Sequence, residues 1–483
     1  MINIFILIIV SILFVYGLKR VFFFKILKKI GEEVFNGFQI LFDKSLSDLQ
    51  KEGLLKKKSK KIVIEILNFF LKLILLLLPI SVIIFLFDSL NFVNKNIIIE
   101  TLFSIEYLIA FSIVLFISAS LKKDEYIDSL DRFSFGDKFI HYLAFSSPKV
   151  MKFFFNLEEL FIKDKIKCNK HKMVFITTLA RGGSTALLNA INKSSFISCH
   201  TYRDMPFLTM PNLWNFISRG KKRSVEKIDR AHRDGHKIDL DSPEAFEEVL
   251  WKIYWPEKYN KEKIDFIDES SQNDNFKIFF TNHTKKIIQV RNENNEKLIS
   301  KNLYYFSKNN NNFTRISFLK KIYPESIILI PIREPLSHAN SLLNQHINFS
   351  LIQKKNKFIL NYMSDIGHYE FGLNHKPLNF RKFNLNNYKQ NDINYWLEYW
   401  ICSHEHIIEN KLNCHIISLD DLVNSPNSSM EIIFKKIGLS KPDVDFSSFF
   451  KKSKKNFDKN TFDRDLYDRA LRIYSVIIDL KIT

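Results

Sequence analysis

The segment MVFITTLARGGSTALLNAI, residues 173–191, decides how this chain folds. Its apolar first half predicts a short buried strand, and STALLNAI predicts a helix that follows at once. Between them, Gly182 and Gly183 allow the backbone to turn tightly and to approach a ligand closely. The N–H groups and the dipole at the start of such a helix attract negative charge. The segment therefore predicts an anion-binding turn between a strand and a helix.

The side chains of this turn strengthen that prediction. Ser184 and Thr185 add hydroxyl donors, and Arg181 adds a planar guanidinium group. The turn resembles the P-loop motif GxxxxGK[ST], but no lysine follows Gly183, which removes the usual support for a nucleoside triphosphate. An ordinary glycine-containing turn in which a serine caps the helix is the alternative interpretation.

Further strand-like runs follow, each separated from the next by a helix-like stretch. They are SFISCHTY at 195–202, NLYYFS at 302–307, SIILIPI at 326–332 and CHIISLD at 414–420. Strands that alternate with helices predict a parallel sheet with helices on both faces. We therefore expect residues 172–483 to form a three-layer α/β domain similar to P-loop NTPases, with its ligand beyond the carboxyl ends of the strands.

A second motif follows one of these strands. In SIILIPIREPLSHANSLLNQH, residues 326–346, the strand ends at Arg333, and Ser341 lies eight residues later near the start of a helix. Eight residues are enough for the chain to turn the corner, so the two side chains can converge on one phosphate. The spacing alone is common by chance. Its position after a strand, downstream of an anion-binding turn, makes it specific.

Together these motifs resemble the sulfotransferases that use 3′-phosphoadenosine 5′-phosphosulfate (PAPS). In that family a turn of the type P-R-S-G-T-T binds the 5′-phosphosulfate, and an arginine and a serine spaced as in the second motif bind the 3′-phosphate. Here ARGGST takes the place of the first motif, with Ala180 where proline is usual. The stretches 306–324 and 415–439 also look like family segments, so the resemblance covers about residues 172–440. It implies that PAPS is bound by Arg181, Gly182, Gly183, Ser184, Thr185, Arg333 and Ser341.

The resemblance also implies the chemistry, which is transfer of a sulfuryl group to a hydroxyl of a glycan, a glycolipid or a protein. Negative charge builds on the leaving oxygen, where Arg181 and Lys308 can stabilise it. The acceptor hydroxyl needs a base. Asp204 is the first choice, because related enzymes carry a carboxylate just after the second strand. A surface pair with Arg203 or a helix cap is the alternative interpretation of Asp204. The reserve candidates for the base are His200, His236 and Glu244.

The first 123 residues predict a membrane region. Three apolar segments, 2–18, 62–87 and 97–119, are expected to be transmembrane helices, although the first is short enough to lie in the interface instead. Twelve Lys and Arg lie between the first two segments, whereas only Lys95 lies between the second and the third. The positive-inside rule then places the catalytic domain in the cytoplasm. A position in the Golgi lumen is the habit of the family in eukaryotes. Residues 124–171 are interpreted as a helical bridge.

Composition limits the other function classes. The 483 residues include 71 Lys and Arg against 52 Asp and Glu, a net charge of +19, which suggests nucleic acid or an anionic membrane as a partner. Nucleic acid is not expected, because aromatic residues are not interleaved with the basic stretches. Four cysteines exclude a disulfide framework.

No metal is expected, because arginine, lysine and backbone donors can stabilise the transferred charge. Cys402, His404 and His406 invite a zinc interpretation, but helical spacing puts His404 on a different face from the other two. Two rival functions stay open. One is a P-loop-type kinase or ATPase, and the other is a non-catalytic membrane scaffold that keeps the fold.

Overall fold

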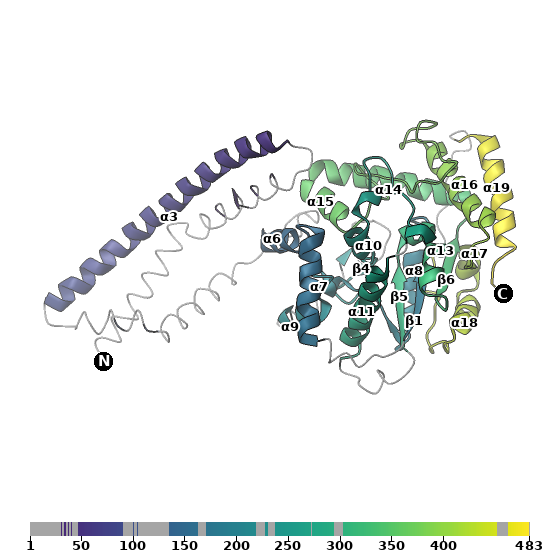
Figure 1. Cartoon of the computed structure of the whole chain (residues 1–483), viewed down its shortest axis with the longest axis horizontal. Coiled ribbons are helices and arrows are strands. Elements are labelled where there is room, and N and C mark those ends of the chain that lie inside the picture. Colours follow the sequence, from purple (N-terminus) through teal and green to yellow (C-terminus); the bar gives the residue numbers. More distant parts are fainter. Residues whose placement is uncertain are drawn as a thin grey trace. The chain divides into compact units, whose positions relative to one another are not determined.

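The protein is described by a computed structural model, which divides the chain into two units, Met1–Ile140 and His141–Thr483 (Figure 1). The described residues are 47–89, 135–162, 171–218, 228–229, 237–271, 273–293, 303–451 and 462–482, with single positions at 30, 33, 34, 37, 40, 100 and 104. Each unit is considered by itself.

The first unit contains one long helix, α3, at Asp48–Ser89. The expected span at 2–18 lies outside the described residues, and so does the span at 97–119 apart from positions 100 and 104. The expected span at 62–87 lies within α3 and includes Glu65 and Lys72. Among the residues that the structure describes, none of the helices is long and apolar enough to cross a membrane. The prediction of a membrane span at 62–87 is therefore not supported.

The second unit is built on a five-stranded sheet with the order β2-β5-β1-β6-β7, in which all the neighbouring strands are parallel. This confirms the prediction of an α/β domain with a parallel sheet. A short antiparallel pair, β3 with β4, stands apart from it. The strands are β1 at His171–Ile176, β2 at Ile197–Ser198, β3 at Ile228–Asp229, β4 at Lys237–Ile238, β5 at Leu303–Lys308, β6 at Ile327–Ile332 and β7 at His415–Ser418.

Helices cover both faces of the sheet. Ile176 of β1 packs in one core with Leu187 of α8 and Ile433 of α18. Phe175 points to the opposite face, where its ring lies 6.4 Å from that of Phe280 in α11. The helices are α6 at Phe135–Ala144, α7 at Pro148–Ile162, α8 at Ser184–Ile191, α9 at Pro211–Ser218, α10 at Glu248–Tyr254, α11 at Asp274–Arg291, α13 at Ile316–Ile322, α14 at Pro335–Lys355, α15 at Lys357–Asp365, α16 at Ile393–Glu409, α17 at Leu419–Asn424, α18 at Pro426–Ile437 and α19 at Arg464–Ile478.

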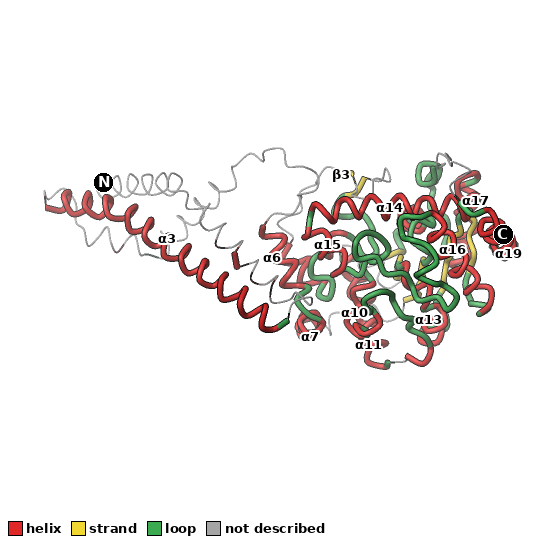
Figure 2. Tube along the Cα trace, turned by 90° about the horizontal axis from the view of Figure 1, so that it is seen from above, coloured by secondary structure: helices red, strands yellow, loops and turns green. Residues whose placement is uncertain are grey.

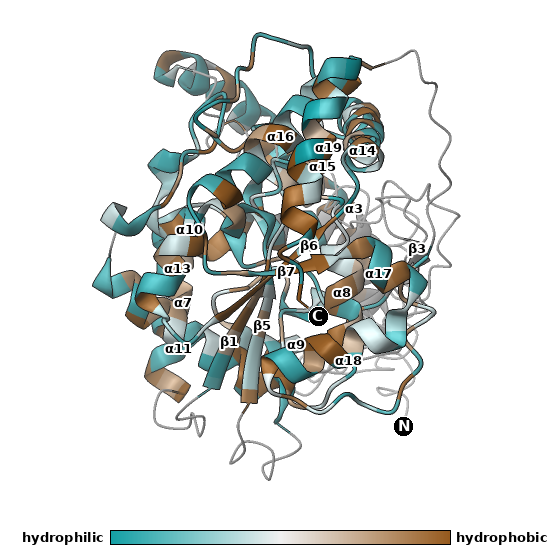
Figure 3. Ribbon diagram, turned by 90° about the vertical axis from the view of Figure 1, so that its right-hand side faces the viewer, coloured by the Kyte–Doolittle hydropathy of each residue, from teal (hydrophilic) through white to brown (hydrophobic). Residues whose placement is uncertain are grey.

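Hydrophobic residues concentrate on the strands, which appear largely in brown between the helices in Figure 3. All six residues of β5 and all but the first of β6 are buried, as expected of strands that are covered on both faces. Beyond the sheet, α14, α16 and α19 pack against one another near the C-terminus (Figure 2).

A buried ion cluster fixes α7 to the rest of the second unit. Lys286 of α11 lies 3.3 Å from Glu158 and 2.9 Å from Glu159, both of α7. Glu158 also accepts the backbone N–H groups of Asn212 and Leu213 at the start of α9, at 2.7 and 2.8 Å. Burial raises the pKa of Glu158 although Lys286 acts in the opposite direction. The second unit thus includes α7, which lies within the stretch interpreted from the sequence as a bridge.

Replacing Lys286 by methionine should destabilise the second unit, because Glu158 and Glu159 would be left together without a cation. Removing one partner of a buried ion pair costs about 3–5 kcal/mol. Urea-induced unfolding measures the effect. Lys277→Met, on the exposed side of the same helix, is the matched control and should change the free energy of unfolding by less than about 0.5 kcal/mol. Equal stability of the two variants would contradict the role of the cluster.

Candidate active site

The turn between β1 and α8 needs both of its glycines, for different reasons. A Cβ atom on Gly182 would lie 2.6 Å from the hydroxyl of Thr178, so a larger residue does not fit. Gly183 has a φ of 97°, and its Cβ would lie 2.7 Å from Leu419 at the start of α17. Arg181 also adopts a positive φ, of 70°. The backbone is therefore held in a conformation that few other sequences could adopt.

The start of α8 supplies the donors of the turn. Ser184 is buried and Thr185 is half-buried in the first helical turn, where the backbone N–H groups have no partner within the helix. The N-cap residue is Gly183, and it makes no side-chain cap. The alternative interpretation, a turn capped by a serine side chain, therefore does not describe this helix.

The structure brings the second motif to this turn. Arg333 ends β6, and Ser341 lies near the start of α14. The guanidinium Nε of Arg181 donates to the Ser341 hydroxyl at 3.2 Å. The guanidinium Nη1 of Arg333 donates to the backbone carbonyl of Arg181, also at 3.2 Å. Residues far apart in the sequence thus meet beyond the carboxyl ends of β1 and β6.

The charges at this place favour an anion. Burial and then the positive charge of Arg181 lower the pKa of Arg333 to about 10, although Glu334 and Asp420 act in the opposite direction. Arg333 therefore stays protonated at neutral pH while it lies near a second guanidinium group. An anion between the two arginines would relieve their repulsion and strengthen the hydrogen bonds that both can donate.

A buried histidine supports the backbone of the turn. His338 of α14 contacts the backbone carbonyl of Ala180 at 2.8 Å through Nε2. A carbonyl can only accept, so Nε2 carries the proton. Burial and then the charge of Arg333 hold the pKa of His338 well below its usual range. The neutral imidazole adds a donor beside the turn without adding charge.

Lys308 lies beside the first residues of the same turn. It ends β5, pairs in register with Ile176 at the end of β1, and is 7% exposed. Its neighbours tie the two strand ends together, since the N–H of Asn309 donates to the carbonyl of Ile176 at 3.1 Å and the hydroxyl of Thr177 donates to the carbonyl of Asn310 at 3.3 Å. The carboxylate of Glu244 lies near Lys308, with Nζ to Oε1 at 4.0 Å.

Asp204 is held in an ion-paired position. Its carboxylate accepts from the backbone N–H of Thr201 at 2.9 Å, contacts His200 at 3.2 Å and pairs with Arg291. Arg203, in contrast, pairs with Asp241 on the surface. Thr201 and Asp204 form a capping box, so the helix-cap interpretation of Asp204 fits the structure.

The acidity of Asp204 makes it a poor base. Burial by itself raises the pKa of Asp204, but the charge of Arg291 and the hydrogen bonds from His200 and Arg291 outweigh it, so the pKa lies below its usual value. Of the reserve candidates for the base, Glu244 lies near Lys308, and His236 lies outside the described residues. His200 contacts Asp204 and, at 3.1 Å, the ring of His283.

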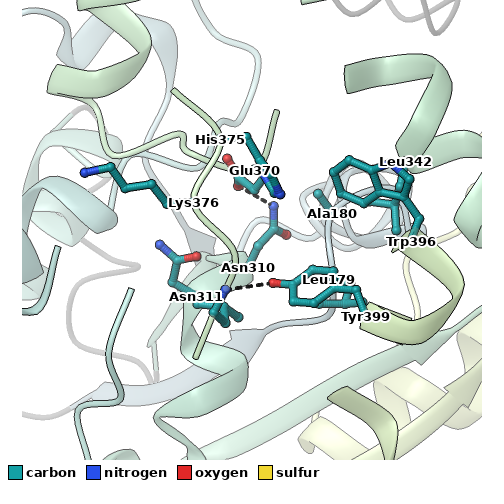
Figure 4. A pocket seen from close by; sticks show the side chains of 11 residues that line it. Leu179, Ala180, Asn310, Asn311, Leu342, Glu370, His375, Lys376, Trp396 and Tyr399 are labelled. Carbon is teal, nitrogen blue, oxygen red and sulfur yellow. Dashed lines mark hydrogen bonds between the residues drawn. The ribbon is translucent and has the colours of Figure 1, made fainter. Parts of the chain in front are cut away.

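A small pocket adjoins the turn (Figure 4). The amide of Asn310 donates to Glu370 at 2.8 Å, and the hydroxyl of Tyr399 accepts the N–H of Leu378 at 3.0 Å. The pocket is lined by Leu179, Ala180, Asn310, Asn311, Leu342, Glu370, His375, Lys376, Leu378, Trp396 and Tyr399.

Among the described residues, no group of three or more His, Cys, Asp and Glu side chains is arranged so that it could hold a metal ion. Cys402, His404 and His406 all lie in α16. His404 contacts the carbonyl of Trp400 at 2.7 Å, and its ring stacks on that indole.

Comparison with known proteins bears on this geometry. Residues 173–375 match the sulfotransferase family. The match begins in β1 and ends beyond α15, so it includes the turn between β1 and α8, Lys308, and the second motif with Arg333 and Ser341. The matched segment thus contains the residues brought together at the carboxyl ends of β5, β1 and β6.

Solved structures of sulfotransferases also resemble the chain. The sulfotransferase STF1 from Mycobacterium tuberculosis H37Rv is 12% identical with a TM-score of 0.37, over 61% of this chain and 75% of that one. The sulfotransferase STF9 from Mycobacterium avium is 11% identical with a TM-score of 0.30, over 67% of this chain and 80% of that one. No curated protein matches the chain in sequence.

Replacing Asp204 by asparagine should destabilise the second unit at neutral pH, because Arg291 would lose its buried partner, at a cost of about 3 kcal/mol. A carboxylate with a lowered pKa stabilises the fold above its unfolded pKa, near 3.9, and that contribution is lost as the pH falls below it.

The difference in free energy of unfolding between wild type and Asp204→Asn should therefore be constant from about pH 7 to pH 5 and shrink from about pH 4 downward. Urea unfolding across this range measures it. Asp241→Asn, in the exposed pair with Arg203, is the control and should change stability by less than about 1 kcal/mol. A difference that grows toward acid pH would contradict the assignment.

Proposed function

We propose that the protein transfers a sulfuryl group from PAPS to a hydroxyl acceptor in a glycan, a glycolipid or a protein. The observation that carries this proposal is the meeting of Arg181, Arg333 and Ser341 at one turn. The match of residues 173–375 to the sulfotransferase family supports it, since members of that family generally use PAPS.

PAPS has two anionic ends, and the site has two groups of hydrogen-bond donors. The N–H groups at the start of α8, with Ser184 and Thr185, are suited to the 5′-phosphosulfate. Arg333 and Ser341 are suited to the 3′-phosphate, because Arg333 lies at the end of β6, next to β1. Burial and then the charge of Arg181 lower the pKa of Arg333, and this phosphate would counter both effects. The donor supplies the activated sulfuryl group.

Two side chains are placed to stabilise the charge of the leaving oxygen. Arg181 lies in the turn itself, and Lys308 lies at the end of the neighbouring strand. Donors that are fixed before the reaction act without reorganisation, and in many enzymes they contribute more to the rate than any other single effect. Asp204 is not included as the base, since its pair with Arg291 lowers its basicity.

We also propose that residues 1–123 hold the protein at a membrane with the sulfotransferase domain in the cytoplasm, or in the Golgi lumen of a eukaryote. The distribution of basic residues in the sequence supports this, as do the exposed Phe70, Leu71, Ile74 and Leu75 of α3. The full chain should remain in the membrane pellet after carbonate extraction and yield protease-resistant N-terminal fragments. Recovery in the supernatant would contradict the proposal.

Binding of 3′,5′-adenosine bisphosphate tests the donor site. Arg333→Ala should weaken this binding about tenfold to a hundredfold, because a hydrogen bond to a charged group contributes about 1.5–3 kcal/mol. Isothermal titration measures the affinity. Arg381→Ala, at an exposed position, is the matched control and should bind as the wild type does.

Competition with ATP separates the proposal from its rival. A sulfotransferase should bind the bisphosphate more tightly than ATP, and label from 35S-PAPS should appear in an acceptor when membranes are added. If the wild-type protein binds ATP but not the bisphosphate, the kinase alternative replaces the proposal.

A further inference from the structure

Two chain segments run side by side beyond the carboxyl end of β2. Thr201 pairs antiparallel with Pro243. The N–H of Glu244 donates to the carbonyl of His200 at 3.0 Å, and the N–H of Arg203 donates to the carbonyl of Leu240 at 2.9 Å. Residues 240–244 therefore run alongside residues 200–203. This pairing brings Glu244 to the end of the sheet where β5 adjoins β2.

Glu244 lies among groups suited to a reacting carboxylate. Its Oε2 accepts from the hydroxyl of Tyr202 at 2.6 Å, and its Oε1 accepts from the N–H of Ala245 at 2.8 Å. Lys308 Nζ is 4.0 Å from Oε1, which is beyond hydrogen-bond distance. Two neutral donors thus orient the carboxylate and Lys308 lies at ion-pair distance from it, whereas the guanidinium group of Arg291 binds Asp204 directly.

We propose that Glu244 is the general base of the sulfuryl transfer, and that Asp204 and Arg291 are positioning residues. The proposal rests on the function proposed above. Glu244 accepts the proton of the acceptor hydroxyl as its oxygen forms a bond to sulfur. The bond from sulfur to the 5′-phosphate oxygen breaks, and its electron pair stays on the bisphosphate near Arg181 and Lys308. The proton then passes from Glu244 to solvent.

The positioning role follows from what Arg291 binds. Its Nε donates to the carbonyl of Cys199 at 3.0 Å, and its Nη2 pairs with Asp204. One guanidinium group thereby holds both ends of the segment 199–204. Since this segment carries Tyr202 and pairs with Pro243 and Glu244, the pair of Asp204 with Arg291 fixes the place of the base without contacting the reactants.

Two acceptors that differ in acidity separate a base from a positioning residue. At about pH 8, 4-nitrophenol is already ionised, whereas phenol, like tyrosine with its pKa of about 10, must lose a proton during the reaction. Glu244→Gln should lower turnover of phenol by about 10²- to 10⁴-fold, the usual contribution of a base. It should leave turnover of 4-nitrophenol within about tenfold of the wild type, and Glu244→Asp should recover part of the loss.

Asp204→Asn should lower turnover of both phenols by the same factor, because misplaced groups affect each reaction alike. Titration with 3′,5′-adenosine bisphosphate shows that each variant is folded. The assignment of Glu244 would be overturned if Glu244→Gln lowered turnover of both acceptors equally. It would also be overturned if Asp204→Asn lowered turnover of phenol alone.

The outcome also distinguishes this inference from the function on which it rests. A wild-type protein that neither binds the bisphosphate nor releases it from PAPS contradicts the proposed function. If the wild type binds the bisphosphate but turns over neither phenol, the release of bisphosphate by hydrolysis of PAPS is compared instead, with water as the acceptor. Hydrolysis that is unchanged in Glu244→Gln would then overturn the role of Glu244, and a loss of about 10²-fold or more would support it.

Discussion

The guanidinium groups of Arg181 and Arg333 are held close together at the carboxyl ends of β1 and β6, and the rest of the site depends on this arrangement. Arg333 donates to the backbone of Arg181, and burial together with the like charge of Arg181 lowers the pKa of Arg333 to about 10. Such an arrangement is unfavourable by itself, and it persists because the surrounding fold fixes it. Neutral His338 and the two glycines of the turn hold the backbone there without adding charge of either sign.

Under the proposed function, the order of the strands divides the carboxyl end of the sheet into two parts. The ends of β6 and β1 would bind the phosphate and the phosphosulfate, whereas the ends of β5 and β2 carry Lys308 and the segment that holds Glu244. Parallel strands place all these ends on the same side of the domain. A donor that lies across β6 and β1 would therefore meet its acceptor above β5, with no further element needed to bring the two together.

The sequence predicted those parts of the site that depend on local pattern. The turn after β1 and the spacing of Arg333 and Ser341 follow from short motifs on either side of buried strands. The environment of Asp204 could not be predicted, since its partner Arg291 is 87 residues away. Glu244 reaches the sheet edge only because residues 240–244 pair with residues 200–203, and such short irregular pairing leaves no periodic signal.

The ion cluster of Lys286 has a consequence for where the autonomous folding unit begins. The sequence motifs set that beginning at residue 172, in the first strand of the sheet. A chain shortened to that point would keep the ammonium group in the interior and discard both carboxylates that neutralise it. It would also remove Glu158 as the acceptor of the hydrogen bonds from the backbone N–H groups at the start of α9. A part of this protein that folds alone should therefore include Glu158 and Glu159 of α7, which precede the first sequence motif.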